Sequence, residues 1–376
     1  MSNDNREYVD INSRSNVSRG TSSSRGKAPQ NGKKKKKNIL AIRIVCIVLS
    51  LLCLGGGCAC LYGYATINSF GYKDLPDTTG VTGNSGEDTT QDLQFDTQSS
   101  DLLNDPYVLN VMLFGEDQPA NSSGYHGRSD TMILLSIDNR HQKIKMTSFL
   151  RDTYVEIPGH YSSKLNVSYA LGGAQLAIQT IEANYGVQID RYAIVNFSTF
   201  KSIVDIMGGV ELYLTQNEID YINCQIAENG QNEYLNASEG MVTLNGQQAL
   251  WYARNRGGTY NGMSFSGDDW DRTDRQRNFL EAVITNLKED ATLAEIVQIV
   301  NSIGPKVTTN LKKTEIQSLV ANAMTYLGYD IEQCSMPSDG TWSYGYNSAG
   351  SVILVNDWNQ ARLDLAKFIY EELVTQ

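Results

Sequence analysis

The pattern of apolar and polar positions divides the chain into a polar N-terminal tail, one long apolar run, a polar connecting segment and a large region of short apolar segments. Residues 1–38 hold almost no large apolar side chains, so nothing there offsets the entropy lost on folding, and we predict a disordered tail. Residues 39–64 are predominantly apolar and would form a helix about 39 Å long, enough to cross a bilayer. Residues 65–105 are polar and acidic, which is typical of a solvated linker.

From residue 106 onward, strand patterns alternate with helical patterns. The predicted strands are 107–115, 131–137, 143–150, 191–197, 210–214 and 351–355. The predicted helices are 172–185, 198–207, 244–253, 275–288, 292–303, 313–327 and 357–373. Residues 219–240 read as a polar loop. The alternation predicts an α/β fold with a mixed sheet flanked by helices, in which a main domain spans 106–290 and the C-terminal helices and strand of 291–376 pack on it.

The net charge of −11 is unevenly distributed along the chain. Residues 1–38 carry ten Lys and Arg against three Asp and Glu, a net of +7, which leaves −18 for residues 39–376. An acidic main body argues against a large nucleic-acid interface. Basic residues before an apolar run favour the cytoplasmic side, so we predict a cytoplasmic tail, a single membrane span and an extracytoplasmic domain. A cleaved signal peptide is the alternative, although the run is long for one.

Charged residues gather between positions 252 and 276. The arginines there are Arg254, Arg256, Arg272 and Arg275, and the aspartates are Asp268, Asp269, Asp271 and Asp274. Guanidinium groups suit phosphate oxygens because they donate two parallel hydrogen bonds and keep their charge when partly buried. Carboxylates hold hard cations or take a proton from a hydroxyl. A salt-bridged surface loop explains the same composition, so this segment alone leaves both interpretations open.

Two further Arg–Asp groups lie at predicted strand ends, where α/β sheets usually place their sites. Arg128 and Asp130 lie immediately before the second strand, and Asp117 lies in the loop after the first. Arg151 and Asp152 follow the third strand. Together the three groups predict guanidiniums around a polyanion and carboxylates around a divalent cation. That combination is typical of phosphoryl transfer, in which catalysis is mostly positioning and charge neutralisation.

Motifs for other chemistries are missing from the sequence. His126, His141 and His160 show no metal-ligand spacing with one another or with cysteines. The sequence has no G-x-S-x-G elbow, no G-x-G-x-x-G and no Walker A motif, which disfavours serine hydrolases and the common nucleotide sites. Cys224 and Cys334 are the only cysteines outside the apolar run, and a disulfide between them remains open.

Several linked motifs resemble those of the LytR–CpsA–Psr proteins of bacterial envelopes. In chain order they are L-F-G-E-D, R-S-D-T-M-I-L-L-S-I, L-R-D-T-Y-V-E-I-P, S-K-L-N-V-S-Y-A-L-G-G, V-N-F-S-T-F-K-S-I-V-D-I-M-G-G-V, L-N-G-Q-Q-A-L-W-Y-A-R-N-R and D-W-D-R-T-D-R-Q. The resemblance covers roughly residues 107–288 and, more weakly, the region after it. So many motifs in one order make the match highly specific.

The resemblance implies a magnesium-dependent (or manganese-dependent) phosphotransferase at the cell membrane. Such an enzyme moves a glycopolymer, such as teichoic acid or capsule, from a polyprenyl-pyrophosphate carrier to peptidoglycan, and it needs no nucleic acid. The apolar strands and helices would line a tunnel for the isoprenoid tail. Two alternatives stay open: a non-catalytic polyprenyl-pyrophosphate binder or scaffold, and the transcriptional attenuator that the family's historical naming suggests. The sequence does not indicate which polymer is transferred.

The resemblance also implies roles for individual residues. The groups that grip the pyrophosphate would be Arg128, Arg151, Arg254, Arg256, Arg272, Arg275 and Gln276. The metal ligands would be Asp117 and Asp130. Asp269 would be the base that deprotonates the acceptor hydroxyl, acting with Arg254, Arg272 and Arg275, while Asp152 would orient a neighbouring arginine. Two positions depart from the family pattern: Leu150 replaces a proline, and Gln118-Pro119 follow Asp117 where a basic residue is usual, which makes Asp117 the weaker candidate ligand.

Overall fold

A computed structural model describes the second of the chain's two compact units, Leu61–Gln376. The described residues are 71–72, 102–116, 127–347 and 350–371. The predicted tail, the predicted span, most of the linker and Asp117 therefore lie outside the described residues. None of the helices that the structure describes is long and apolar enough to cross a membrane.

Within the described residues, seven strands form one mixed sheet. In spatial order they are β1 (Gly71–Tyr72), β12 (Thr308–Thr309), β7 (Arg191–Asn196), β2 (Val108–Glu116), β3 (Ser129–Asp138), β4 (Lys143–Phe149) and β13 (Asp330–Met336). The strand β2 runs parallel to β7 and antiparallel to β3, while β4 runs antiparallel to β3 and parallel to β13. The short strand β12 is antiparallel to β7 and parallel to β1. The predicted α/β class with a mixed sheet is confirmed.

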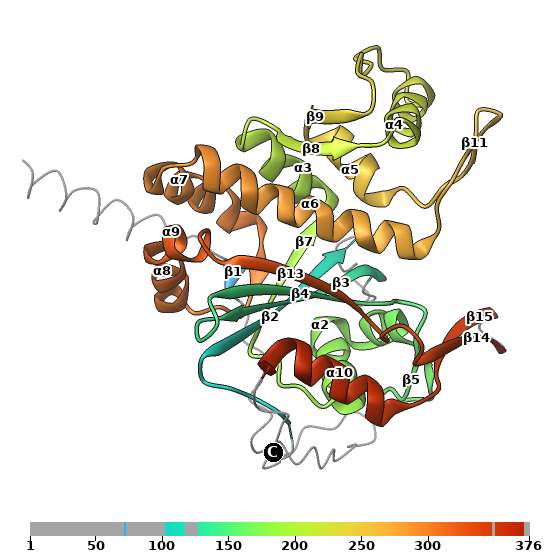
Figure 1. Ribbon diagram of the computed structural model, residues 1–376, viewed down its shortest axis with the longest axis vertical. Helices are drawn as coiled ribbons and strands as arrows, with labels where there is room; N and C mark the ends of the chain where they lie inside the picture. The colour runs from blue at the N-terminus through green and yellow to red at the C-terminus, as the bar shows by residue number, and fades with distance from the viewer. Residues whose placement is uncertain (1–70, 73–101, 117–126, 348–349, 372–376) are drawn as a thin grey trace, which may run out of the picture. The chain divides into compact units, whose positions relative to one another are not determined.

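Helices α2 (Leu165–Tyr185) and α10 (Trp358–Tyr370) cover one face of this sheet, below it in Figure 1. The rings of Phe149, Tyr185 and Trp358 pack edge to face in the cluster between them, with centroids 4.9 and 5.3 Å apart. The helix α2 begins earlier than the predicted start at residue 172, and non-helical backbone angles at Gly172 and Gly173 interrupt it.

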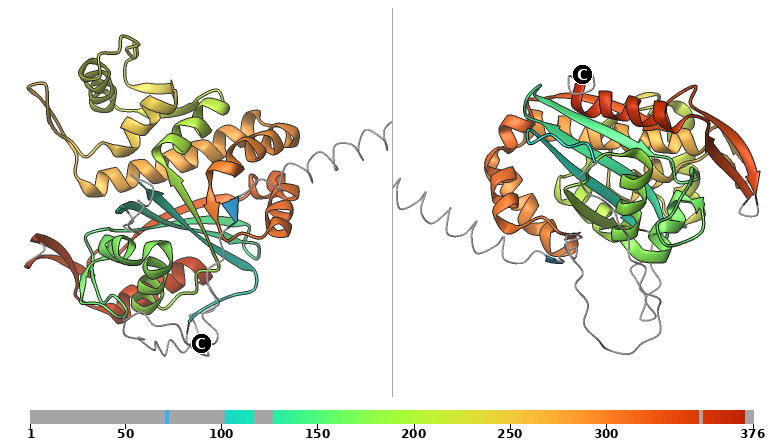
Figure 2. Two further views of the ribbon diagram at one scale, coloured as in Figure 1. Left: turned by 180° about the vertical axis from the view of Figure 1, so that it is seen from behind. Right: turned by 90° about the horizontal axis from the view of Figure 1, so that it is seen from below.

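The other face is covered by α3 (Phe197–Ile206), α5 (Gly246–Arg254) and the long helix α6 (Asp269–Asp290). Helix α4 (Gln216–Glu228) and the hairpin β8–β9 (Val210–Leu214 and Gly240–Leu244) complete a second hydrophobic cluster with them. Figure 2 shows the same three layers from behind. The first cluster lies between the sheet and α2 with α10, whereas the second lies among the helices and the β8–β9 hairpin and includes no residue of the seven-stranded sheet.

The remaining elements are short. The helices are α7 (Leu293–Ile303), η2 (Gly304–Lys306), α8 (Lys313–Ala321) and α9 (Ala323–Tyr326). The hairpins are β5–β6 (Tyr154–Val155 and Ser163–Lys164), β10–β11 (Gly258–Tyr260 and Met263–Phe265) and β14–β15 (Trp342–Asn347 and Gly350–Val355).

The structure differs from the sequence prediction at several elements. The predicted loop at 219–240 contains most of α4, whose N-terminus is closed by a capping box between Thr215 and Glu218. Helix α6 begins at Asp269 rather than at residue 275, because Asp268 and Asp271 form a capping box that satisfies its first backbone N–H groups. Strand β13 was not predicted, because its D-I-E-Q-C-S-M sequence lacks a strand pattern. Both cysteines of the domain are free, so no Cys224–Cys334 disulfide forms.

Candidate active site

Four elements bring the predicted phosphate-binding residues to one place. Asp130 lies at the start of β3, and Arg151 lies in the turn directly after the neighbouring strand β4. Because β3 and β4 are antiparallel, the start of one lies beside the end of the other. Asp269 and Arg272 occupy the first turn of α6, and Arg256 follows the end of α5. Arginines and aspartates that are separated by more than a hundred residues thus form one cluster, which we call the Arg–Asp cluster.

Asp130 is held by two guanidiniums of this cluster. Its Oδ1 lies 2.8 Å from Nη1 of Arg151, and its Oδ2 lies 3.5 Å from Nη1 of Arg272. Arg272 also donates a hydrogen bond of 3.1 Å to the Asp130 carbonyl. The backbone of β3 and the first turn of α6 are therefore joined directly.

Asp269 lies between three arginines. Its Oδ1 is 3.2 Å from Nη2 of Arg151, 3.1 Å from Nη2 of Arg272 and 4.0 Å from Nη1 of Arg256. Arg272 additionally donates a 3.1 Å hydrogen bond to Asp269 Oδ2. The Arg–Asp cluster therefore contains three guanidiniums, of Arg151, Arg256 and Arg272, around the two carboxylates of Asp130 and Asp269, and it carries a net positive charge suited to an anion.

The side chains of the cluster differ in their exposure to solvent. The Arg272 side chain is 4% exposed, whereas those of Asp130 and Arg256 are 44% and 47% exposed. Burial favours a higher pKa for Asp130, but the charges of Arg151 and Arg272 lower that pKa, so the carboxylate stays ionised. Burial and repulsion from Arg151 lower the pKa of Arg272, whereas Asp269 opposes this effect. Within the described residues, Nε of Arg272 has no hydrogen-bond partner, so this buried guanidinium keeps an unused donor.

The structure places the other predicted arginines differently. Arg254 is exposed, and its guanidinium lies 4.5 Å from the centre of the Phe197 ring. Arg275 is buried, and its Nε donates a 2.7 Å bond to Glu218 while its Nη1 donates to the Asn255 carbonyl at 3.0 Å. The positive charge of Arg275 is therefore paired with the carboxylate of Glu218 inside the protein. Sequence patterns did not predict this pair, because Glu218 and Arg275 lie far apart in the chain.

Three further predicted residues lie at the margins. Arg128 is exposed just before β3. Gln276 donates a long bond of 3.4 Å to the Ala253 carbonyl. Asp152 lies 2.8 Å from Nζ of Lys164 and 3.5 Å from Nε of Arg151, an arrangement that suits a residue that orients Arg151.

Two other features of the described residues carry no comparable chemistry. Asp138, His141 and Glu371 lie close enough together to hold a metal ion, but Nζ of the fully buried Lys145 lies 2.8 Å from both Asp138 and Glu371 and supplies the positive charge there.

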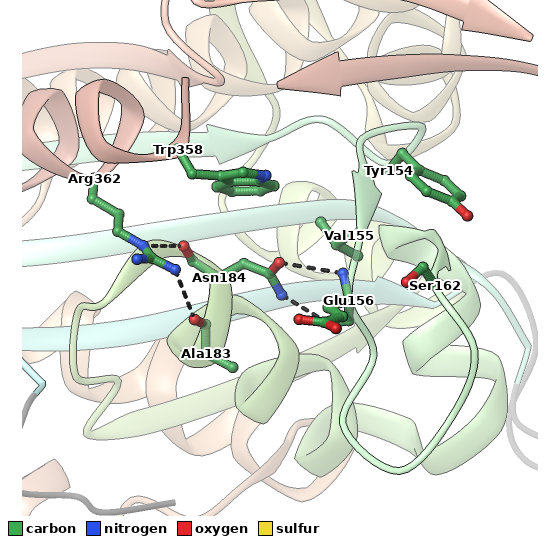
Figure 3. A pocket seen from close by; sticks show the side chains of 8 residues that line it. All are labelled: Tyr154, Val155, Glu156, Ser162, Ala183, Asn184, Trp358 and Arg362. Atoms are coloured by element: carbon green, nitrogen blue, oxygen red, sulfur yellow. Dashed lines mark hydrogen bonds between the residues drawn. The ribbon is translucent and has the colours of Figure 1, made fainter. Parts of the chain in front are cut away.

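A pocket of about 330 Å³ lies beside α2 (Figure 3), and its Arg362 donates hydrogen bonds to the carbonyls of Asn184 and Ala183 at the end of that helix. Its lining is Tyr154, Val155, Glu156, Ser162, Ala183, Asn184, Trp358 and Arg362. We assign neither feature to the active site.

Comparison with known proteins identifies the family. Residues 77–361 match the model of the LytR_cpsA_psr family. The chain belongs to the LytR–CpsA–Psr family. A member from Halalkalibacterium halodurans, named polyisoprenyl-teichoic acid–peptidoglycan teichoic acid transferase TagU, is 31% identical over 81% of this chain and 90% of its own length. Its counterpart of the same name from Oceanobacillus iheyensis is 33% identical over 65% of this chain and 72% of its own length.

Solved structures show the same LytR–CpsA–Psr fold. TagT from Bacillus subtilis superposes with a TM-score of 0.54 at 23% identity, covering 71% of this chain and 94% of TagT. A structure of TagT with bound octaprenyl pyrophosphate lipid gives a TM-score of 0.53 at 22% identity, covering 70% of this chain and 91% of TagT. At this identity, the likeness establishes the fold.

Proposed function

We propose that this protein is a membrane-anchored phosphotransferase that moves a glycopolymer from a polyprenyl-pyrophosphate carrier to peptidoglycan. The observation that carries the proposal is the Arg–Asp cluster, in which Arg151, Arg256 and Arg272 converge on Asp130 and Asp269. Relatives of this chain are named as teichoic acid transferases that act between a polyisoprenyl carrier and peptidoglycan. The choice between teichoic acid, capsule and other glycans depends on the donor pocket.

The arginines of the cluster would act on the leaving group. In the reaction, an acceptor hydroxyl oxygen bonds to the phosphorus next to the glycopolymer, and the phosphoanhydride bond breaks to release polyprenyl phosphate. Guanidiniums around both phosphates offset the negative charge that develops on that leaving group. The buried Arg272, which is held by the Asp130 carbonyl, is already oriented for this role and loses little side-chain entropy on binding.

Asp269 would take the proton of the acceptor hydroxyl. In the structure its carboxylate is engaged by Arg151 and Arg272. Phosphate oxygens of the donor would compete for the same guanidiniums. Binding of the donor would thus free part of the Asp269 carboxylate to accept a hydrogen bond from the acceptor hydroxyl. This coupling protects the site from activating a hydroxyl before the donor is in place.

A magnesium ion, or Mn²⁺ in its place, is the cofactor that the family resemblance implies, and Asp130 fits it. The carboxylate of Asp130 is ionised and 44% exposed at the edge of the cluster. Magnesium commonly binds through one or two carboxylates together with substrate phosphates. Asp130 would hold the ion, with Asp117 as a second candidate. When bound, the ion would supply further neutralisation of phosphate charge.

The face of the sheet toward α6 supports a site for the isoprenoid tail. Val111, Ile133 and Met146 on this face are buried, yet they belong to neither hydrophobic cluster of the described residues. Leu113 and Leu135 beside them are only partly buried. This apolar surface lies between the sheet and its covering helices and belongs to neither hydrophobic cluster. Such a surface suits a long hydrocarbon chain. We propose that the lipid tail lies there.

Residues 39–64 would anchor the protein with the tail in the cytoplasm and the domain outside. An anchor keeps the domain near membrane-bound donor and raises the frequency of encounter. Protease treatment of intact protoplasts tests this topology. We expect digestion of the domain and protection of an epitope placed in residues 1–38. Protection of the domain would contradict the proposed orientation.

The decisive experiment is a transfer assay with the purified protein, a synthetic lipid-linked donor, peptidoglycan and magnesium. We expect release of polyprenyl phosphate together with a new phosphodiester in the wall polymer. Asp269→Asn and Arg272→Ala should each lower the rate at least about a hundredfold. Asp274→Asn, on the exposed side of the same helix, is the matched control and should retain activity.

The alternatives give different results in this assay. A non-catalytic binder or scaffold would bind the lipid-linked donor but release no polyprenyl phosphate. A transcriptional attenuator would act through residues 1–38, since the acidic domain suits no nucleic acid. Unimpaired transfer by both Asp269→Asn and Arg272→Ala would overturn the assignment of the cluster as the active site.

A further inference from the structure

Aromatic side chains form a surface directly beside the Arg–Asp cluster. Trp270 follows Asp269 in the first turn of α6, and its ring stacks on Trp342 of β14 with centroids 4.8 Å apart at 29°. Trp342 meets Tyr344 edge to face at 5.0 Å and 81°. The indole N–H of Trp270 donates a 3.2 Å bond to the Tyr344 hydroxyl. We call Trp270, Trp342, Tyr344 and Tyr346 the aromatic shelf.

Much of the aromatic shelf is open to solvent. Tyr344 is 63% exposed and Tyr346 is 87% exposed. Trp342, Tyr344 and Tyr346 alternate along β14, so their side chains project from the same face of the hairpin. Large aromatic side chains gathered on a surface in this way mark a binding site more often than a packing feature.

The hairpin packs onto the domain through β15, where Val352 lies on the face away from the shelf and Ile353 lies opposite Tyr344 on the shelf's own face. Val352 and Ile353 of β15 are buried, and the backbone N–H of Ile353 donates a 2.9 Å bond to the Asp152 carbonyl. Ile353 also forms a parallel bridge with Thr153. The hairpin is thus attached through β15 to the residues that follow Arg151, while its Trp342 stacks on Trp270, the residue after Asp269.

We propose that the aromatic shelf binds the sugar rings of the acceptor glycan strand. This inference rests on the proposed function, which requires an acceptor hydroxyl next to Asp269. Pyranose rings present faces of C–H bonds that stack on aromatic rings, and the Trp270 N–H and tyrosine hydroxyls offer polar contacts at the ring edges. A glycan on the shelf would bring an acceptor hydroxyl near Asp269, the residue before Trp270 in α6.

Charge favours the acceptor over a phosphate-rich donor polymer. Asp268, Asp271 and Asp339 are exposed around the shelf, and residues 339–347 contain no lysine or arginine. A polyanionic glycopolymer would be repelled there, whereas the amino-sugar backbone of a glycan strand would not. The shelf therefore suits rings of low charge.

Binding is tested with the full-length protein in detergent, without donor, so that the readout does not depend on catalysis. The probe is a soluble N-acetylglucosamine pentamer, followed by uncrosslinked glycan strands. Trp270 and Trp342 are two of the 4 tryptophans, so saturable quenching of intrinsic fluorescence reports binding. Tyr344→Ala should weaken binding about tenfold, and Tyr344→Trp should restore it. Tyr213→Ala, which removes a 56% exposed tyrosine from β8, is the control and should bind as wild type.

Kinetics separate the acceptor from the donor. In the transfer assay, Tyr344→Ala should raise the KM for peptidoglycan about tenfold and leave the KM for the lipid-linked donor unchanged. A raised KM for the donor alone, or glycan binding equal to wild type, would overturn the proposal. If the protein has no transferase activity but binds glycan in a way that depends on Tyr344, the proposed function is refuted and the proposal that the shelf binds sugar rings stands. Loss of transfer in Asp269→Asn with normal glycan binding in Tyr344→Ala would refute only the shelf.

Discussion

At the scale of single residues, arginines of similar sequence context have different surroundings. Arg272 is buried against the two carboxylates of the cluster, Arg275 is bonded to Glu218, and Arg254 is exposed over the ring of Phe197. All three belong to motifs that the sequence associates with pyrophosphate. Stability and activity should therefore respond differently to the loss of each one.

Arg275→Ala should destabilise the protein by about 3 kcal/mol, because it leaves the buried carboxylate of Glu218 without its counter-charge. The double variant Arg275→Met, Glu218→Gln should recover part of that loss. Arg254→Ala should change the free energy of unfolding by less than about 1 kcal/mol, because this side chain is exposed. It should lower transfer about a hundredfold, because the family resemblance makes Arg254 a ligand of the pyrophosphate. Urea unfolding of the unit Leu61–Gln376 and the transfer assay separate the two effects. Equal destabilisation by both substitutions would contradict the placement of Arg275.

Glu182 makes the stability of the fold depend on pH. Burial raises its pKa to about 7, against the hydrogen bond that it accepts from the N–H of Ile189 at 2.9 Å. Because the folded state binds this proton more tightly than the unfolded state, stability is greatest below the ordinary pKa of 4.5 and declines as the pH rises through 7.

Glu182→Gln should raise the free energy of unfolding at pH 8 by about 2 kcal/mol and have little effect at pH 4. Urea unfolding at both values checks this, with the exposed Glu211→Gln as the control. The prediction fails if the difference between wild type and Glu182→Gln is the same at both pH values.

At the scale of elements, the N-terminus of α6 positions the active site. The Asp268 side chain accepts bonds from the N–H groups of Trp270 and Asp271 at 2.8 and 3.0 Å, and this first turn carries Asp269 and Arg272. The sequence places all these residues within one segment but predicts the helix only from residue 275. Two aspartates three residues apart form a weaker capping signal than the Ser/Thr–Glu pattern. The charged residues at the start of the helix also obscured the helical spacing of its apolar positions.

Asp268→Ala should cost about 1 kcal/mol of stability and also lower transfer, because fraying of the first turn displaces Asp269 and Arg272. Thr292→Ala removes the cap of α7 and is the matched control. It should cost a similar amount of stability and leave transfer unchanged. Chemical unfolding and the transfer assay on both variants provide the comparison. Full activity in Asp268→Ala would show that the cap does not position the site.

At the scale of the whole molecule, the two faces of the sheet differ in their hydrophobic packing. The face toward α2 and α10 forms a continuous cluster that includes Phe149, Tyr185 and Trp358. The face toward α6 carries apolar side chains outside both clusters of the described residues. We propose that this second face, and not the main core, binds the lipid tail.

Leu113→Trp should fill space on the α6 face of the sheet, where Leu113 is only partly buried. We expect weaker binding of a long polyprenyl-pyrophosphate donor and unchanged inhibition by inorganic pyrophosphate, which needs only the arginines. Binding assays with both ligands check this expectation. Equal loss of affinity for the two ligands would place the effect of the substitution at the Arg–Asp cluster instead.

The sequence by itself determined the fold class, most strands and helices, and the residue types of the site, because hydrophobic periods and motifs are local properties. It missed β13, whose polar residues are accommodated beside the parallel strand β4, and α4, although α4 buries Ile219, Ile222 and Ile226. The tertiary structure alone decided that Arg272 faces Asp130 while Arg275 faces Glu218, and that Trp342 stacks on Trp270. Such contacts depend on strand order and helix placement, which join residues far apart in the chain.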